Sequence, residues 1–157
     1  MPVKTLKEFL DSNNIKYVTI KHSLAYTSQE IAASIHIKGK EMAKSVLVKI
    51  NGKLAFCVIP ASYKVDFEKL KKILATESIR LANEVEFKDK FPDCEVGAMP
   101  PFGNLYGLDV YADTSLAEDE EIAFNAGSHT EVIRMSYSDF EKLVKPKKLS
   151  FSFQSKL

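Results

Sequence analysis

Apolar and polar residues follow one another along the chain in patterns that predict short helices and strands. Residues 5–13 carry their apolar side chains on one face, as an amphipathic helix does. Residues 15–20 are rich in β-branched and aromatic side chains, which favours a strand. A capping-box pattern at Thr27 predicts a helix that begins there and runs to about residue 34. We therefore expect a helix, a strand and a second helix in this order.

The clearest pattern in the chain is that of a β-hairpin. Residues 45–50 have the composition of a buried strand, and residues 53–60 have that of its partner. Asn51-Gly52 stands between them, and both of these residues tolerate the positive φ angles of a two-residue hairpin turn. Two antiparallel strands joined at Asn51-Gly52 are therefore expected.

After the hairpin the apolar spacing changes to the helical period. Asp66 can cap a helix through Leu74, and Asn83 can cap another over residues 84–91. A second capping box at Ser138 predicts a final helix that runs to Pro146. The residues of the Asp66 helix that we expect to face the core are Phe67, Leu70, Ile73 and Leu74.

The C-terminal half supplies further strands. Residues 108–113, 122–127 and 131–135 have strand patterns, while residues 147–157 are compatible with either an edge strand or a loose tail. Strands and helices are mixed, and the sequence has no internal repeat or linker composition. We therefore expect one α+β domain over residues 1–157, with a mixed, largely antiparallel sheet and flanking helices.

Composition and charge narrow the function classes. The chain has 157 residues, of which 45% are hydrophobic and 27% charged, enough for one domain with a core of its own. Its net charge of +1 gives no long-range field for wrapping duplex nucleic acid, so a nucleic-acid contact would be small. We see no signal sequence and no apolar run long enough to span a bilayer, and expect a cytoplasmic protein with no membrane contact.

Most sequence motifs of known catalytic mechanisms are absent. The chain has no nucleophile elbow, zinc-protease, P-loop or dinucleotide-binding motif, and Cys57 and Cys94 are not spaced as metal ligands. We therefore expect no metal and no cofactor. Cys57 or Cys94 paired with His129 could act as a thiol nucleophile, although Cys57 lies in an apolar strand typical of the core.

The segment from Gly97 to Gly103 has an unusual backbone. Proline fixes its own φ and restricts the preceding residue, so Met99, Pro100 and Pro101 have few conformations, while the flanking glycines keep their freedom. Such a loop offers a ligand mainly backbone groups and an apolar wall. The alternative is a plain Pro-Pro turn between two elements.

Three polar side chains could carry chemistry. Lys44 stands where an apolar strand begins, so its ammonium could lie at the mouth of a pocket, facing a phosphate or an ester oxygen. Ser128 and His129 follow Gly127 in a short polar connection from which a side chain can reach a cleft. Each could equally be an ordinary surface residue, and the sequence pattern leaves both interpretations open.

Three segments in the same chain resemble a known family: Ala43–Val48, Gly97–Gly103 and Phe124–Thr130. By order and spacing they are similar to the YbaK-like aminoacyl-tRNA deacylases, freestanding relatives of the editing (insertion) domain of bacterial prolyl-tRNA synthetase. The resemblance implies the corresponding fold. It also implies hydrolysis of the ester that joins a wrong, small amino acid such as alanine or cysteine to the 3′ end of a tRNA.

The resemblance also implies roles for individual residues. Lys44 corresponds to the essential lysine of the family, and Gly97 to Pro101 correspond to its GxxxP substrate loop. The family uses no metal and no covalent nucleophile, and the terminal ribose hydroxyl beside the ester helps to activate or orient the attacking water. Tyr26 could stack on the terminal adenine or pack as a hydrophobic staple. The expected substrate-binding residues are Tyr26, Gly97, Ala98, Met99, Pro100, Pro101, Phe102, Gly127, Ser128 and His129.

A second function class stays open, that of a non-catalytic module which binds an aminoacylated tRNA end or a nucleotide-like ligand, with Lys44 as a phosphate anchor. In either class the expected partner is the acceptor end of a tRNA. Lys38, Lys40 and the Lys142–Lys148 cluster are candidate phosphate contacts, or simply solubilising surface. The sequence does not decide whether a synthetase is also a physical partner.

Overall fold

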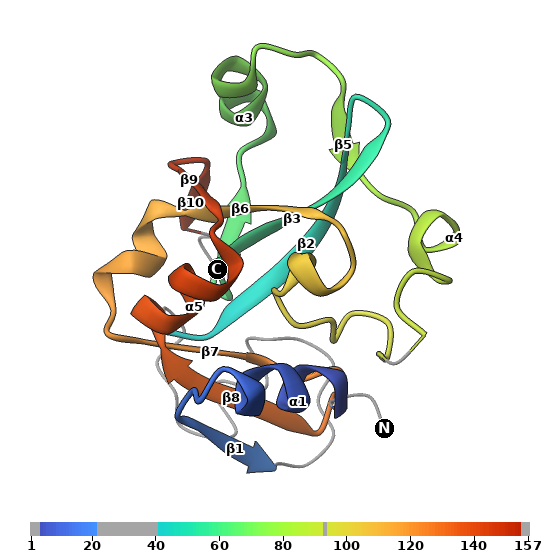
Figure 1. Ribbon diagram of the computed structural model, residues 1–157. Coiled ribbons are helices and arrows are strands. Elements are labelled where there is room, and N and C mark those ends of the chain that lie inside the picture. Colours follow the sequence, from blue (N-terminus) through green and yellow to red (C-terminus); the bar gives the residue numbers. More distant parts are fainter. Residues whose placement is uncertain (1–3, 22–40, 93, 155–157) are drawn as a thin grey trace.

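A computed structural model describes residues 4–21, 41–92 and 94–154 of the chain (Figure 1). The Thr27 helix, Tyr26, Lys38 and Lys40 lie outside the described residues. The described helices are α1 (Lys4–Ser12), α3 (Phe67–Leu74), α4 (Glu84–Phe87) and α5 (Tyr137–Val144), with 3-10 turns η1 (Gly103–Leu105) and η2 (Thr114–Glu118). The described strands are β1 (Tyr17–Lys21), β2 (Ala43–Ile50), β3 (Lys53–Pro60), β4 (Tyr63–Val65), β5 (Ile79–Leu81), β6 (Asp109–Asp113), β7 (Glu121–Asn125), β8 (Glu131–Ser136), β9 (Lys147–Leu149) and β10 (Ser152–Gln154).

The predicted hairpin forms the centre of a five-stranded sheet in the order β5-β2-β3-β6-β9. β2 and β3 pair antiparallel from Ala43 opposite Pro60 to Ile50 opposite Lys53. Asn51 and Gly52 have φ angles of 51° and 82°, as the turn requires. β3–β6 and β6–β9 are parallel pairs, while β2–β5 is antiparallel. The prediction of a hairpin is confirmed.

A second sheet has three antiparallel strands in the order β1-β8-β7, and β10 pairs with β4 in a small third sheet. The first two sheets meet where Met42, beside the start of β2, forms a parallel bridge with Ala123 of β7. Figure 1 shows β7 passing the start of β2 and then continuing in another direction. All but two strand pairs of the sheets are antiparallel, which confirms the α+β class with a mixed, largely antiparallel arrangement.

One apolar core joins the elements that are far apart in the sequence. The ring of Phe102 is fully buried and lies 5.5 Å from that of Phe124 and 5.6 Å from that of Phe140, measured between centroids. Phe9 of α1 contacts the same ring from the other side, at 6.2 Å. The Pro-Pro loop is therefore anchored by its last side chain at the centre of the domain.

Several boundaries differ from the predictions. The final helix begins at Tyr137 and not after Ser138, because the Ser136 side chain is the one that accepts a hydrogen bond from the backbone, at Asp139 N. The Asn83 helix ends at Phe87, and Ile73 of α3 is exposed. β4 and β5 were not expected, and both are three-residue strands whose partners are distant in sequence.

The C-terminal segment is paired at sheet edges up to Gln154. β9 adds to β6, and β10 adds to β4. The buried Asp113 carboxylate accepts hydrogen bonds from the backbone N–H groups of Phe151 and Ser152, at 2.9 and 3.0 Å. Of the two alternatives for residues 147–157, the described part follows the edge-strand one. No helix in the described part of the chain is long and apolar enough to cross a membrane.

Candidate functional site

Two turns that lie some thirty residues apart in the sequence are joined by backbone hydrogen bonds. Gly127 N–H donates to the carbonyl of Ala98 at 2.9 Å, and Glu95 N–H donates to the carbonyl of Gly127 at 2.8 Å. Gly97 and Gly127 have φ angles of 84° and 97°, a region that favours glycine. We call this junction, residues 95–98 with residues 126–129, the glycine crossing. It brings together two of the three segments on which the sequence resemblance rests.

His129 holds the two halves of the glycine crossing together through hydrogen bonds to Glu95 and Val96. Its ring is buried, and Nε2 lies 2.8 Å from the carbonyl oxygen of Val96. Because a carbonyl oxygen only accepts, this contact requires the tautomer with the hydrogen on Nε2. The backbone N–H of His129 donates to Glu95 Oε1 at 3.0 Å. His129 therefore supports the loop around Gly97 and does not offer Nε2 as a free base.

The proline part of the loop faces inward. Ala98, Met99, Pro100, Pro101 and Phe102 are all buried, whereas Gly97 is exposed. A Cβ atom built on Gly97 would lie 3.5 Å from Cε1 of the His129 ring, in ordinary contact. The part of this loop that a ligand can reach is thus the backbone at Gly97. On the other side of the crossing, Ser128 is partly exposed.

Lys44 lies near the start of β2, where it pairs across the hairpin with Ile59. Its side chain is half-buried, and no ion pair joins it to another described residue. Desolvation by burial lowers the pKa of its ammonium group, and the charge of nearby Lys64 lowers that pKa further. A cation held this way favours an anionic or carbonyl oxygen as its partner.

The bridge between the two sheets relates Lys44 to the crossing. Met42 forms a parallel bridge with Ala123 of β7; Lys44 follows Met42 by two residues, and Asn125 follows Ala123 by two and directly precedes Ala126 and Gly127. The strand that carries Lys44 and the strand that leads into the crossing therefore meet at this bridge. Tyr26 lies outside the described residues, and its expected role stays a prediction.

Neither cysteine is placed for nucleophilic catalysis. Burial raises the pKa of the Cys57 thiol to about 12, so the reactive thiolate is not formed near neutral pH. Cys94 is partly buried, with its Sγ 3.3 Å from the hydroxyl of Tyr106. Within residues 4–21, 41–92 and 94–154 no group of three or more His, Cys, Asp or Glu side chains is placed to hold a metal.

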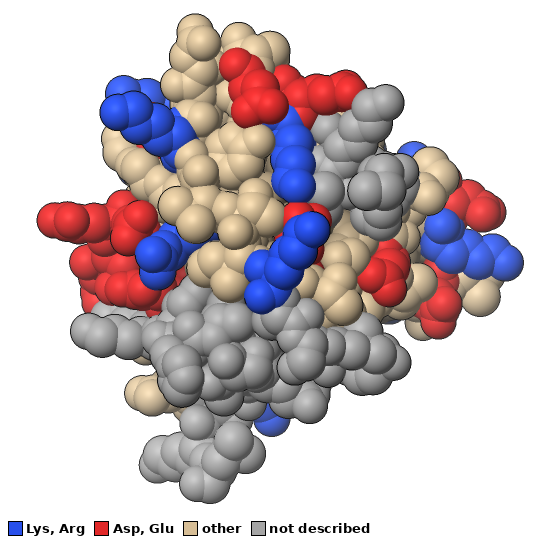
Figure 2. All heavy atoms as spheres, turned by 90° about the horizontal axis from the view of Figure 1, so that it is seen from below, with Lys and Arg blue, Asp and Glu red and all other residues tan. Residues whose placement is uncertain are grey.

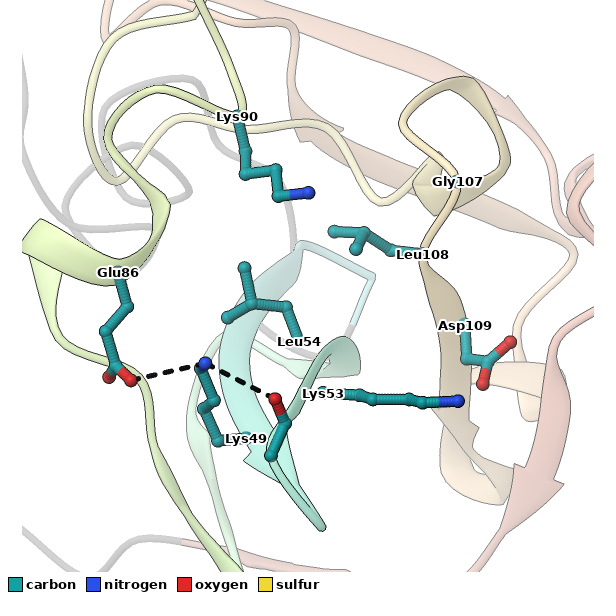
Figure 3. Close-up of a pocket in the computed structure, with 9 residues that line it drawn as sticks. Lys49, Lys53, Leu54, Glu86, Lys90, Gly107, Leu108 and Asp109 are labelled. Carbon is teal, nitrogen blue, oxygen red and sulfur yellow. Dashed lines mark hydrogen bonds and ion pairs between the residues drawn. The ribbon is translucent and has the colours of Figure 1, made fainter.

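A separate pocket of about 480 Å³ lies beside the far end of the hairpin, and sequence reasoning did not single it out (Figure 3). Its charged residues are Lys49, Lys53, Glu86, Lys90 and Asp109. Lys49 Nζ lies 3.4 Å from Glu86 and 3.4 Å from the carbonyl oxygen of Gly52. Figure 3 shows Lys53 extending toward Asp109 and Lys90 reaching in from the opposite side. We call this the lysine pocket.

The charges of the lysine pocket largely balance. Glu86 also accepts two hydrogen bonds from Arg80, each of 2.8 Å, and these hold its pKa down at about 2. Elsewhere, Figure 2 shows blue and red side chains interspersed with tan on one face of the molecule, and no single sign covers that face. The expected small nucleic-acid footprint stays a prediction.

Sequence reasoning missed two residues at the crossing. Glu95 caps the His129 amide, and Asn125 is buried at the end of β7. Asn125 stands inside the segment that carries the resemblance, so its position could have drawn notice, whereas nothing local marks Glu95 as a partner of His129.

Comparison with known proteins gives the following relations. Residues 22–143, more than half of the chain, match the sequence model of the aminoacyl-tRNA editing domain family. Similar curated proteins include the proline–tRNA ligases of Bacillus mycoides (strain KBAB4) and Bacillus cereus (strain AH187), each 27% identical over 89 residues. These matches cover 57% of this chain but 16% of each ligase, so the chain spans a small part of their length.

Solved structures share the fold. A hypothetical protein, APE2540, superimposes with a TM-score of 0.85 and 18% identity, covering 96% of this chain and 100% of that one. A candidate trans-editing enzyme for prolyl tRNA synthetase gives a TM-score of 0.82 and 17% identity, with 97% of each chain covered. At these identities the likeness concerns the fold alone.

Proposed function

Because this chain belongs to the family of aminoacyl-tRNA editing domains, we propose that it is a trans-editing deacylase. Its reaction is hydrolysis of the ester that links a small, wrongly attached amino acid to the 3′ end of a tRNA, with Ala-tRNA(Pro) and Cys-tRNA(Pro) as the first candidates. The proline–tRNA ligases and the trans-editing candidate among the similar proteins support this choice of tRNA. The acceptor end of a mischarged tRNA in the cytoplasm is the proposed partner, with a synthetase as a further one.

The single observation that carries the proposal is that half-buried Lys44 lies near the start of β2, which the Met42–Ala123 bridge joins to β7, the strand that leads into the glycine crossing. An aminoacyl ester is already reactive, so a site can hydrolyse it by fixing its position and stabilising the oxygen on which negative charge develops. Lys44 supplies the positive charge, and its half-buried position strengthens the interaction relative to one in water. The exposed backbone at Gly97 supplies the positioning surface.

The attacking water needs a proton acceptor, and we propose that the substrate provides or orients it. His129 donates through Nε2 to the Val96 carbonyl, which leaves its basic lone pair on the buried Nδ1, and Cys57 is held as a thiol, so neither presents an accessible base. The ribose hydroxyl next to the ester is close to the reacting carbon in any bound pose. It can accept a hydrogen bond from the water and direct it at the carbonyl carbon; as the bond from the carbonyl carbon to the 3′ oxygen breaks, the proton lost by the water passes to that oxygen, which leaves as a hydroxyl.

Selectivity for a small amino acid follows from the rigid loop. Met99, Pro100 and Pro101 are buried and have few conformations, so the loop cannot move aside cheaply for a longer side chain. A single methylene changes binding by only about 1–3 kcal/mol, so we expect the enzyme to discriminate by size over roughly one to two orders of magnitude per methylene.

The test is the loss of labelled amino acid from a panel of charged tRNAs. Ala-tRNA(Pro) and Cys-tRNA(Pro) are examined first, then Ser- and Thr-charged tRNAs, each with the wild type and Lys44→Ala. Hydrolysis of one or more of them by the wild type, lost in the variant, supports the deacylase. Binding of the charged tRNA by the wild type without any hydrolysis would instead favour the non-catalytic binding module.

A further inference from the structure

Asn125 ends β7 as a polar residue in an apolar setting. Only 5% of its surface is exposed, and its side-chain oxygen Oδ1 has no hydrogen-bond partner within the part of the chain that the structure describes. An unpaired buried polar group is costly, and most such groups in folded proteins are paired. The described residues therefore supply no hydrogen-bond donor to Asn125 Oδ1.

The position of Asn125 relates this oxygen to the proposed reaction centre. Ala123 and Asn125 project to the same side of β7, and Val132, which pairs with Asn125 across the β7–β8 ladder, faces that side too. Met42, Ala61, Ala123 and Val132 pack together there in one cluster. Lys44 follows Met42 by two residues and so projects to the same side as Asn125.

Lys44 and Asn125 offer opposite hydrogen-bonding groups to a ligand, a donor and an acceptor. The ammonium of Lys44 is a donor with no anionic partner among the described residues, and Asn125 Oδ1 is an acceptor with no donor. A ligand that satisfies both carries an oxygen acceptor and, close to it, a hydrogen-bond donor. The 3′ end of an aminoacyl-tRNA has such a pair in its ester carbonyl and the ribose hydroxyl on the neighbouring carbon.

Charge selects the ribose hydroxyl over the other donor of the substrate, the α-ammonium group. Burial and, after it, the positive charge of Lys64 lower the pKa of Lys44, so the charge of Lys64 is felt at Lys44. A second ammonium would be repelled here, whereas a hydroxyl is neutral. The amide of Asn is a neutral acceptor, which suits a neutral donor.

Resting on the proposed function, we propose that Asn125 is a substrate-positioning residue whose side-chain oxygen accepts a hydrogen bond from the ribose hydroxyl beside the scissile ester. With its hydrogen directed at Asn125, that hydroxyl keeps its lone pairs for the attacking water, which it orients toward the carbonyl carbon. Asn125 Oδ1 is buried in the unliganded protein, so the proposal requires the carboxamide to turn about the Cβ–Cγ bond when the ligand binds.

The experiment compares two substrates with two enzymes. The substrates are non-hydrolysable, amide-linked alanyl minihelices ending either in a ribose with its free neighbouring hydroxyl or in the deoxyribose that lacks it. The enzymes are the wild type and Asn125→Leu, which keeps the side-chain size but removes the acceptor. The wild type should bind the ribose ligand about tenfold more tightly than the deoxyribose ligand, the size of one hydrogen bond. Asn125→Leu should bind both equally, at the weaker affinity.

A purely structural role of Asn125 predicts a different result. In that case Asn125→Leu weakens binding of both ligands by the same factor and the tenfold preference remains, which would overturn the proposal. Asn125→Asp keeps an acceptor of the same shape and should keep the preference, and equal thermal unfolding midpoints show that the variants are folded. If the wild type binds neither ligand and hydrolyses no charged tRNA, the proposed function itself fails, a result distinct from a retained preference.

Discussion

The glycine crossing and the lysine pocket are opposite ways to build a surface that a ligand could use. The lysine pocket is a hollow of about 480 Å³ whose walls carry three lysines and two carboxylates. The crossing has few charged side chains and is defined by backbone hydrogen bonds between residues 95–98 and 126–129. In the lysine pocket Lys49 pairs with Glu86, whereas Lys44 of β2 has no ion-pair partner among the described residues.

The difference between the two regions shows why the presence of a cavity does not by itself identify a reaction centre. A pocket lined by charged surface side chains can bind a phosphate weakly, since exposed charge pairs contribute little. A reaction on an activated ester needs fixed positions and one strong charge instead. We propose that the crossing and Lys44 provide both, and the following predictions set them against the lysine pocket.

The largest expected effect is on catalysis. Lys44→Ala should lower the single-turnover deacylation rate by about 10²–10³, corresponding to ~2.7–4 kcal/mol, because it removes the charge that stabilises the developing oxyanion. Lys90→Ala, in the lysine pocket, should change the rate by less than about threefold, as for an exposed charge. Equal losses in the two variants would mean that the lysine pocket takes part in the reaction.

The next effect concerns stability. A Cβ atom on Gly103, at the end of the proline loop, would lie 2.6 Å from Val110 Cγ2 and 2.7 Å from the carbonyl oxygen of Leu108. Gly103→Ala should therefore lower the free energy of unfolding by about 1–3 kcal/mol or more. Gly107, which lines the lysine pocket, has a φ of 70° and no atom within 4 Å of such a Cβ. Gly107→Ala should cost only about 1–2 kcal/mol, from its backbone conformation.

Denaturant unfolding of both variants measures these costs. Gly103→Ala should be the less stable of the two and should also deacylate more slowly, because the loop that ends at Gly103 is the proposed substrate-positioning loop. Full activity with the expected loss of stability would separate the loop from the reaction.

A smaller effect is expected on the titration of Lys44. Burial and the charge of Lys64 both lower the pKa of Lys44, so Lys64→Met should raise that pKa while burial continues to lower it. Activity that requires the charged ammonium falls as pH rises through this pKa, so the alkaline limb of the profile should move to higher pH. Titration of the Lys44 ¹³Cε signal measures the pKa directly, with Lys64→Arg as the control that should leave it in place.

The smallest effect is expected on the pH dependence of stability, through Glu86 in the lysine pocket. Hydrogen bonds from Arg80 and from the Asn83 backbone hold the pKa of Glu86 at about 2, below its ordinary value of 4.5. The stabilisation is therefore present above the ordinary value and lost as pH falls toward 2. Glu86→Gln should lower the unfolding midpoint slightly at pH 7 and hardly at all at pH 2. A difference that persists at pH 2 would show that another interaction is involved.

The sequence predicted the elements that depend on neighbouring residues. Asn51-Gly52 and Asp66 specify their turn and helix start locally, and both predictions are confirmed. The start of the last helix was predicted wrongly because Ser136 and Ser138 both stand where a cap is chemically suitable. The long-range hydrogen bond from Tyr137 N–H to the Glu120 carbonyl, at 2.9 Å, places Tyr137 at the first position of the helix. No local pattern contains that contact.

In the candidate site, too, local features could be predicted from the sequence and long-range contacts could not. Glycines and prolines in the loop predict an unusual backbone there, and the positive φ of Gly97 and the buried prolines agree with this expectation. The crossing itself joins residues about thirty positions apart and could be inferred only from the family resemblance. The roles of Lys44 and of the loop as a substrate surface stay predictions.

The most direct test of the account is to locate the bound substrate end. Backbone amide signals of the ¹⁵N-labelled protein are followed during titration with an amide-linked alanyl minihelix. The account predicts the largest shifts at Gly97, Gly127 and His129 and at Lys44 in β2, and little change at Lys53 and Gly107. Shifts concentrated at Lys53, Lys90 and Gly107, with the crossing unchanged, would place the substrate in the lysine pocket and contradict the account.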